Sequence, residues 1–173
     1  ASVFAKKPNA DVVLEAMHAE LKRSQKGLQF EDYPAPYFIG YQVKDIETAE
    51  VTARRGALYS SPSSLSRQMR VEVRVGSYEQ DSSDDREGPG YGAMTVYQPS
   101  TILPVDDHVN AIRSALWLLT DQVYKESLSS YLRVKGQQIY KAEESERSDS
   151  FSREKAYTHQ DKVDRLRFNR AGW

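Results

Sequence analysis

The stretch from Tyr37 to Tyr78 constrains the fold most, because apolar and polar residues alternate along much of it. Successive side chains of a β-strand point to opposite faces of the sheet, so this alternation predicts half-buried antiparallel strands. The residues that share an apolar face are Tyr37, Ile39, Tyr41 and Val43 in the first run and Met69, Val71, Val73 and Val75 in the last. We expect three consecutive strands, with the middle one from Glu50 to Tyr59 and a polar loop from Ser60 to Ser66.

A helix is predicted ahead of these strands, from about Asn9 to Lys26. Its apolar residues recur at intervals of three and four, which is typical of one buried stripe. The members of this stripe are Val13, Leu14, Met17 and Leu21. Gly27 suits the position just past the end of a helix.

Beyond the strands we expect a further strand from Ala93 to Gln98 and a turn from Pro99 to Pro104. A long second helix then begins near Asp106 and Asp107, whose carboxylates suit the positive end of a helix. Its apolar spacing continues to about Ala142 unless the helix breaks near Gly136. The predicted fold is α+β: an antiparallel, meander-like sheet flanked by an N-terminal helix and a long second helix, with an extended charged C-terminal arm.

Length and composition restrict the classes of protein that fit. A chain of 173 residues is most simply one domain, which we place at residues 1–142, with a charged extended tail or interdomain arm at 143–173. The net charge of −1 gives no basic field for nucleic acid, and no apolar run reaches the roughly 20 residues of a membrane span. The absence of Cys excludes thiol catalysis and Cys-based zinc sites. An N-terminal Ala1 fits removal of Met, cleavage of a signal peptide or excision from a longer chain.

Two polar segments are candidate contacts for a protein partner. The alternatives are a mobile hairpin tip for the first and an extended interdomain arm or edge strand for the second. The first is the acidic, Gly-rich loop from Tyr78 to Gly92, with Asp81, Asp84, Asp85 and Glu87. Its carboxylates miss the spacing of a calcium loop, and its glycines neither follow a buried strand nor enter a helix as a phosphate-binding loop does. The second is the tail, where arginines alternate with aromatic residues: Arg165, Arg167, Phe168, Arg170 and Trp173.

The three histidines, His18, His108 and His159, lie in separate regions, and none begins an HExxH or HExxxH motif. A zinc peptidase needs at least three placed ligands and a carboxylate that activates water. The sequence therefore predicts no catalytic, cofactor-binding or metal-ligating residue in this chain.

Several blocks, in the expected order from about Val12 to Ala156, resemble the N-terminal region of larger members of the TldD/PmbA family, the modulators of DNA gyrase. They are VLEAMHAELKRSQKGLQF, PYFIGYQVKD, ARRGALYSS, RVEVRVGSYEQD, LPVDDHVNAIRSALWLLTDQVYKESL and DSFSREKA. The resemblance implies a bacterial, zinc-metallopeptidase-like protein in two parts, with a curved sheet flanked by helices in the first part. It also implies that the zinc lies beyond this first part, in a companion domain or subunit.

Two kinds of function fit these sequence features. The first is a non-catalytic domain or subunit of a TldD/PmbA-like assembly, which shapes a substrate groove or a dimer interface. The alternative is a free-standing protein-binding module that uses the acidic loop and the tail. Both imply a homo- or hetero-oligomer, and the resemblance favours a periplasmic or secreted location, with the cytoplasm as the alternative.

Overall fold

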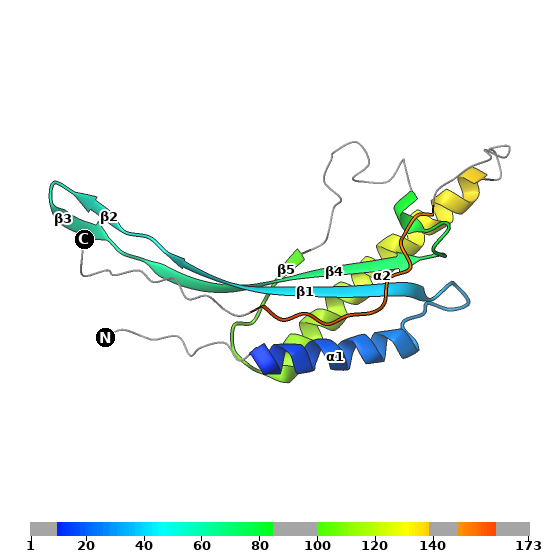
Figure 1. The fold of residues 1–173 in the computed structure, drawn as a ribbon, viewed down its shortest axis with the longest axis horizontal. Helices are drawn as coiled ribbons and strands as arrows, with labels where there is room; N and C mark the ends of the chain where they lie inside the picture. The colour runs from blue at the N-terminus through cyan, green and yellow to red at the C-terminus, as the bar shows by residue number, and fades with distance from the viewer. Residues whose placement is uncertain (1–9, 85–99, 139–148, 162–173) are drawn as a thin grey trace.

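The computed structural model describes residues 10–84, 100–138 and 149–161, and in them the fold is α+β, as predicted (Figure 1). The elements are α1 (Ala10–Gly27), β1 (Pro36–Ala49), β2 (Thr52–Arg54), β3 (Ala57–Ser60), β4 (Ser63–Val75), the short 3₁₀ helix η1 (Ser82–Asp84), β5 (Ser100–Leu103) and α2 (Val109–Gln138). Neither helix in this part of the chain is long and apolar enough to cross a membrane.

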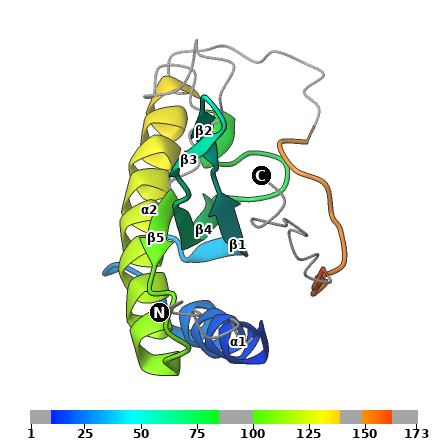
Figure 2. The same cartoon turned by 90° about the vertical axis from the view of Figure 1, so that its left-hand side faces the viewer.

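The main sheet has the order β1-β4-β5 and is antiparallel throughout. β1 and β4 pair continuously from Phe38 opposite Arg74 to Ala49 opposite Ser63, so each is far longer than β5. The helix α2 covers one face of the sheet, and the segment 149–161 lies on the other side (Figure 2). The predicted apolar face of β4 is the centre of the core, where Met69, Val71, Val73 and Val75 pack with Ile112, Leu116, Val123 and Tyr124 of α2.

The predicted stripe of α1 is only partly correct. Val13 is buried, whereas Leu14, Met17 and Leu21 are half-buried. The fully buried positions continue instead through Ala16, Glu20 and Ser24. These residues still recur every three or four positions, so the helical period holds, but a carboxylate and a hydroxyl occupy half of the buried stripe.

The segment from Glu50 to Tyr59 forms a small hairpin of β2 and β3 rather than the single strand that we expected. The chain reverses at Arg55 and Gly56, which both adopt positive φ, +52° and +77°, between the paired residues Arg54 and Ala57. Two consecutive residues with positive φ are the geometry of a two-residue type I′ turn, whose twist matches that of the flanking strands.

Two other expected loops are strands. Ser63–Ser66 belongs to β4, because its backbone pairs with the end of β1 from Ile46 to Ala49. β5 occupies 100–103, where we expected a turn, and pairs with β4 from Arg67 to Arg70. In both cases backbone pairing to a neighbouring strand makes the segment extended although its local preference for extended structure is weak. The expected strand from Ala93 to Gln98 lies outside the described residues.

The long helix α2 was predicted correctly, but Asp106 and Asp107 do not cap it. The cap is His108, whose Nδ1 accepts a hydrogen bond from the backbone N–H of Ala111 at 3.4 Å and whose carbonyl accepts one from Ile112 at 3.1 Å. The described helix has 30 residues and so extends about 45 Å at 1.5 Å per residue. It passes through Gly136 without a break.

Asp107 is used instead by a buried arginine of the sheet. Arg67 is fully buried and binds Asp45 through Nε at 2.6 Å and Nη2 at 3.0 Å. It also donates to Asp107 at 3.3 Å and to the carbonyl of Pro104 at 3.2 Å. This cluster closes the core at the loop that leads into α2.

Candidate partner-binding surface

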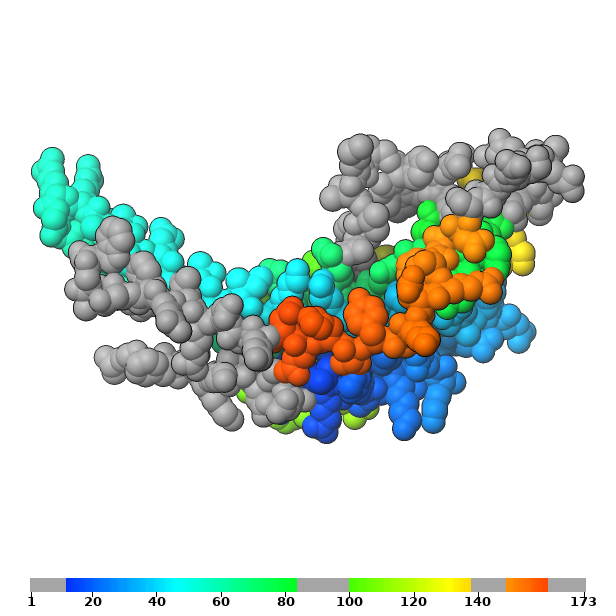
Figure 3. Space-filling model, in the orientation of Figure 1, coloured from blue at the N-terminus to red at the C-terminus, as the bar shows by residue number. Residues whose placement is uncertain are grey.

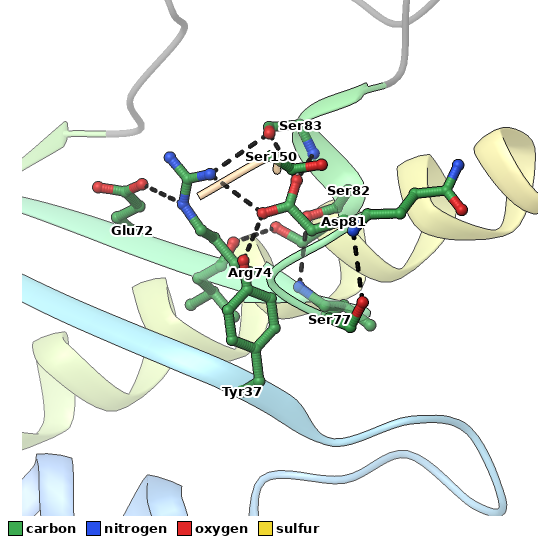
Figure 4. Close-up of polar contacts among 12 residues, drawn as sticks. Tyr37, Glu72, Arg74, Ser77, Asp81, Ser82, Ser83 and Ser150 are labelled. Carbon is green, nitrogen blue, oxygen red and sulfur yellow. Dashed lines mark hydrogen bonds and ion pairs between the residues drawn. The ribbon is translucent and has the colours of Figure 1, made fainter. Parts of the chain in front are cut away.

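The face of the sheet that points away from α2 has its own polar network at the end of β4 (Figure 4). Arg74 donates through Nε to Glu72 at 2.7 Å and through Nη1 to Asp81 at 3.0 Å. Even-numbered residues of β4 point away from the core, so Glu72 and Arg74 share this face. The network therefore joins the strand to the loop that follows it.

Asp81 is the centre of this network and is 0 % exposed, although the sequence suggested an exposed contact loop. Its Oδ2 also accepts from the Tyr37 hydroxyl at 2.6 Å, and its Oδ1 accepts from the backbone N–H and the hydroxyl of Ser83 at 2.7 and 2.5 Å. The chain turns back at Gly76, which has φ +123° and pairs with Asp81, so the carboxylate is folded over the sheet instead of facing solvent. Asp81 is therefore a structural residue of the loop.

The pKa shifts agree with this geometry. Burial alone raises the pKa of Asp81, but the hydrogen bonds from Ser83, Tyr37 and Arg74 outweigh it and hold this pKa below its usual value. Burial, and then the hydrogen bond to Asp81, raise the pKa of the Tyr37 phenol above its usual value. Tyr37 thus stays protonated and donates to an ionised carboxylate.

The segment 149–161 is anchored to this network by one aromatic side chain. The ring of Phe151 lies 4.8 Å from that of Phe38, in edge contact, and 6.5 Å from that of Tyr78, in stacked contact. The guanidinium carbon of Arg74 lies 3.9 Å from the centre of the Phe151 ring. Gly40 leaves room for this cluster, because a Cβ there would lie 3.2 Å from the Phe38 ring.

Polar contacts hold the same segment at both ends. The Phe151 N–H donates to the carbonyl of Tyr78 at 3.1 Å, and Arg153 forms an ion pair with Glu79. Further along, Thr158 hydrogen-bonds His18 of α1 at 3.3 Å. Figure 3 shows this segment, in orange, as a strip on the surface beside α1 and β1. Sequence reasoning missed Phe151, whose only signal was its place in the DSFSREKA block.

A second exposed feature is the ribbon, which we define as residues 46–49, β2, β3 and residues 63–66. β1 and β4 curve away from the helices and carry this ribbon at their far end (Figure 1). It carries exposed apolar side chains, since Leu58 is 57 % exposed and Tyr59 is 81 % exposed. The ribbon therefore presents apolar surface well outside the core.

The other predicted contact residues are placed as follows. Asp84 ends the short helix η1. The described residues do not include Asp85, Glu87, Arg165, Arg167, Phe168, Arg170 or Trp173. The histidines stay apart, since His108 caps α2, His18 meets Thr158, and His159 lies 2.8 Å from Asp161. Within the described ranges no group of three His, Asp or Glu residues could hold a metal ion.

Comparison of the chain with protein-family models, with curated proteins and with solved structures finds no match. The resemblance to the TldD/PmbA family thus rests on the sequence blocks alone.

Proposed function

We propose that this chain is a non-catalytic domain or subunit of a TldD/PmbA-like, zinc-metallopeptidase-type assembly. In this proposal its ribbon packs against the companion part and shapes a substrate groove or a dimer interface. The zinc and the residues that activate water belong to the companion. The observation that carries the proposal is the projecting ribbon, whose apolar residues have no core of their own.

In the described residues the ribbon consists of paired strands with no third strand beside them. A two-stranded hairpin is marginally stable in water unless a third strand or a packed face supports it. In the described residues β5 supports β4 only from Arg67 to Arg70, so the ribbon lies beyond the third strand. Exposed aromatic and aliphatic side chains on such a ribbon are typical of a protein-binding surface. Its paired strands also offer backbone edges to which a partner strand can add.

The companion is tested by native mass spectrometry of the assembly purified from its source. We expect a mass well above the 19.7 kDa of this chain, bound zinc in the companion, and peptide cleavage by the assembly. A lone monomer of 19.7 kDa would contradict the proposal. A companion without zinc or peptide cleavage would contradict its metallopeptidase part.

The ribbon is tested by shortening the hairpin. Ala49 and Ser63 are paired, and the Glu50 N–H donates to the Pro62 carbonyl at 3.0 Å. Residues 50–62 therefore leave and rejoin the sheet at one point. Replacing them by Asn-Gly joins β1 to β4 through a two-residue turn. We expect unchanged thermal stability of the core and loss of the companion.

A milder pair of variants controls for the deletion. Leu58→Ser removes an exposed apolar side chain from the ribbon, and Leu132→Ser removes one from α2. We expect the first to weaken assembly and the second to leave it unchanged. Equal assembly of both variants and of the shortened chain would show that the ribbon is not the interface.

A further inference from the structure

A groove of about 480 Å³ opens between α1 and the first half of α2, away from the ribbon. Its lining residues come from both helices and are mostly polar: Glu20, Arg23, Asn110, Arg113, Ser114 and Trp117. The proposed function uses none of them. The groove nevertheless contains a buried carboxylate, two guanidinium groups and a partly exposed indole.

Glu20 organises the two arginines. It is 3 % exposed and accepts from Arg23 Nε through Oε2 at 2.6 Å. Its Oε1 accepts from Arg113 Nε at 3.1 Å and lies 3.0 Å from Arg113 Nη2. A buried carboxylate is costly unless both oxygens are paired, so Glu20 fixes both guanidinium groups in place.

A hydrogen-bond chain of Ser24, Tyr41 and Thr120, which do not line the groove, lies one helical turn beyond Glu20. The hydroxyl of Thr120 donates to the Leu116 carbonyl at 2.6 Å, so the Tyr41 hydroxyl, 3.0 Å away, must donate to Thr120. The Tyr41 oxygen then accepts from Ser24, whose hydroxyl lies 3.4 Å away. This directional chain lies next to Glu20 on α1 and joins both helices to β1.

The groove has a net positive charge even though both oxygens of Glu20 are paired with arginines. Two guanidinium groups face one carboxylate, which leaves a local charge of +1. Each guanidinium has five N–H donors. In the part of the chain that the structure describes, Arg23 and Arg113 donate only to Glu20, and both side chains are partly exposed.

An apolar wall stands beside this charge. Trp117 is 45 % exposed, and the guanidinium carbon of Arg23 lies 5.8 Å from the centre of its ring. The stacked arginine keeps its donors beside an accessible indole face. A ligand that fits both features has a single negative charge next to an apolar group.

We propose that this groove binds an acidic segment of a partner protein, with one Asp or Glu carboxylate on Arg23 and Arg113 and an adjacent apolar side chain on Trp117. The single negative charge of a carboxylate matches the local +1. A phosphate dianion would leave an excess charge of −1 beside the buried Glu20, whereas a carboxylate brings the site to neutrality. Forked hydrogen bonds from arginine to carboxylate are among the strongest in proteins.

The test is an NMR titration of the ¹⁵N-labelled chain that follows the indole N–H of Trp117 and the Nε–H of Arg23 and Arg113. The probe is the capped peptide acetyl-Ala-Leu-Glu-Leu-Ala-amide, and its Gln analogue is the control ligand. We expect the Glu peptide to shift all three signals with an affinity that falls as salt is added, and the Gln peptide to leave them in place. Absence of shifts with millimolar Glu peptide, or equal shifts with both peptides, would overturn the proposal.

Matched variants locate the effect. Arg23→Gln leaves Arg113 on Glu20, so the fold is retained, and we expect about tenfold or greater weakening of binding. Lys22→Gln makes the same charge change on an exposed neighbour in α1 and should leave affinity within about twofold. Unchanged binding by Arg23→Gln would overturn the site. Tighter binding of inorganic phosphate, or of a peptide whose only carboxylate is its C-terminus, would overturn the assignment to an acidic side chain.

Discussion

Replacing Asp81 by asparagine tests whether the loop after β4 depends on a buried negative charge. The substitution keeps the shape of the side chain but turns one acceptor oxygen into an NH₂ donor. Each carboxylate oxygen of Asp81 accepts two hydrogen bonds, Oδ2 from Tyr37 and Arg74 and Oδ1 from the N–H and hydroxyl of Ser83. Whichever way the amide turns, its NH₂ group therefore faces an N–H donor, and that donor cannot become an acceptor.

The magnitude follows from what is lost. The hydroxyls of Tyr37 and Ser83 can rotate and accept from the new amide, but the Arg74 guanidinium or the Ser83 N–H then loses its acceptor. An unsatisfied buried donor costs about 1–3 kcal/mol, and breaking a buried ion pair costs about 3–5 kcal/mol. Arg74 keeps Glu72 as a partner at 2.7 Å, so the lower part of the combined range applies. We expect a loss of about 2–3 kcal/mol in the free energy of unfolding at neutral pH.

The pH dependence gives a sharper check. Because the pKa of Asp81 is lowered in the folded state, its contribution is fully present above the unfolded-state pKa of about 3.9. This contribution is lost as the pH falls below that value through the folded-state pKa, whereas asparagine does not titrate. The difference between wild type and Asp81→Asn should thus shrink from about pH 7 to about pH 3.

Urea unfolding followed by circular dichroism at both pH values measures this difference. Asp121→Asn is the control, since Asp121 forms an exposed pair with Lys125 at 2.7 Å and should change stability by less than about 0.5 kcal/mol. A cost below about 1 kcal/mol for Asp81→Asn at neutral pH, or an equal cost at both pH values, would refute the reasoning.

Three further substitutions test the loop, the core and the C-terminal segment. Gly76→Ala should lower the free energy of unfolding by at least about 2 kcal/mol, and the melting temperature with it, because φ is +123° and a Cβ would lie 2.6 Å from the Gln80 carbonyl oxygen. An unchanged melting temperature would contradict this. Tyr124→Phe should cost about 1–3 kcal/mol in urea unfolding, because its hydroxyl bonds two backbone groups of the chain between α1 and β1. Phe151→Ala should speed tryptic cleavage within 149–161 about tenfold, since the ring contacts that anchor the segment stabilise it by about 1.4 kcal/mol or more. The melting temperature of the core should stay the same. An unchanged cleavage rate would show that other contacts hold the segment.

The elements that sequence predicted well have strong local periodicity. The odd-numbered residues of β4 from Met69 to Val75 are buried and the even-numbered ones are not, as period-2 alternation requires. α1 likewise begins and ends within a few residues of its predicted bounds, and α2 begins within a few residues of its predicted start. The predicted end of α2 near Ala142 lies outside the described residues. In these elements local pattern and tertiary packing agree.

The elements that sequence missed depend on pairing or on special backbone geometry. Nothing local marks Ser63–Ser66 as a strand, because its serines favour loops, and only its pairing to the end of β1 makes it extended. The hairpin at Arg55 and Gly56 has a single sequence signal, the glycine, since arginine at positive φ is rare. The burial of Asp81 depends on Tyr37, 44 positions earlier in the chain.

Glu20 and Arg67 are the positions at which the binary pattern itself fails, and they fail differently. Both are charged residues in buried positions of a regular element. Arg67 donates to two aspartates and a carbonyl, which leaves one excess negative charge on side chains that are mostly buried in the cluster. Glu20 instead draws two arginines to one carboxylate, which leaves excess positive charge at an open groove beside an exposed indole. Natural sequences break local rules mainly at functional or strained sites. Both clusters carry one excess charge, but the side chains of Arg23 and Arg113 are 40 % and 37 % exposed, whereas those of Asp45 and Asp107 are 23 % and 7 % exposed. The accessibility of the excess charge at Glu20 is therefore the reason to expect a ligand there and not at Arg67.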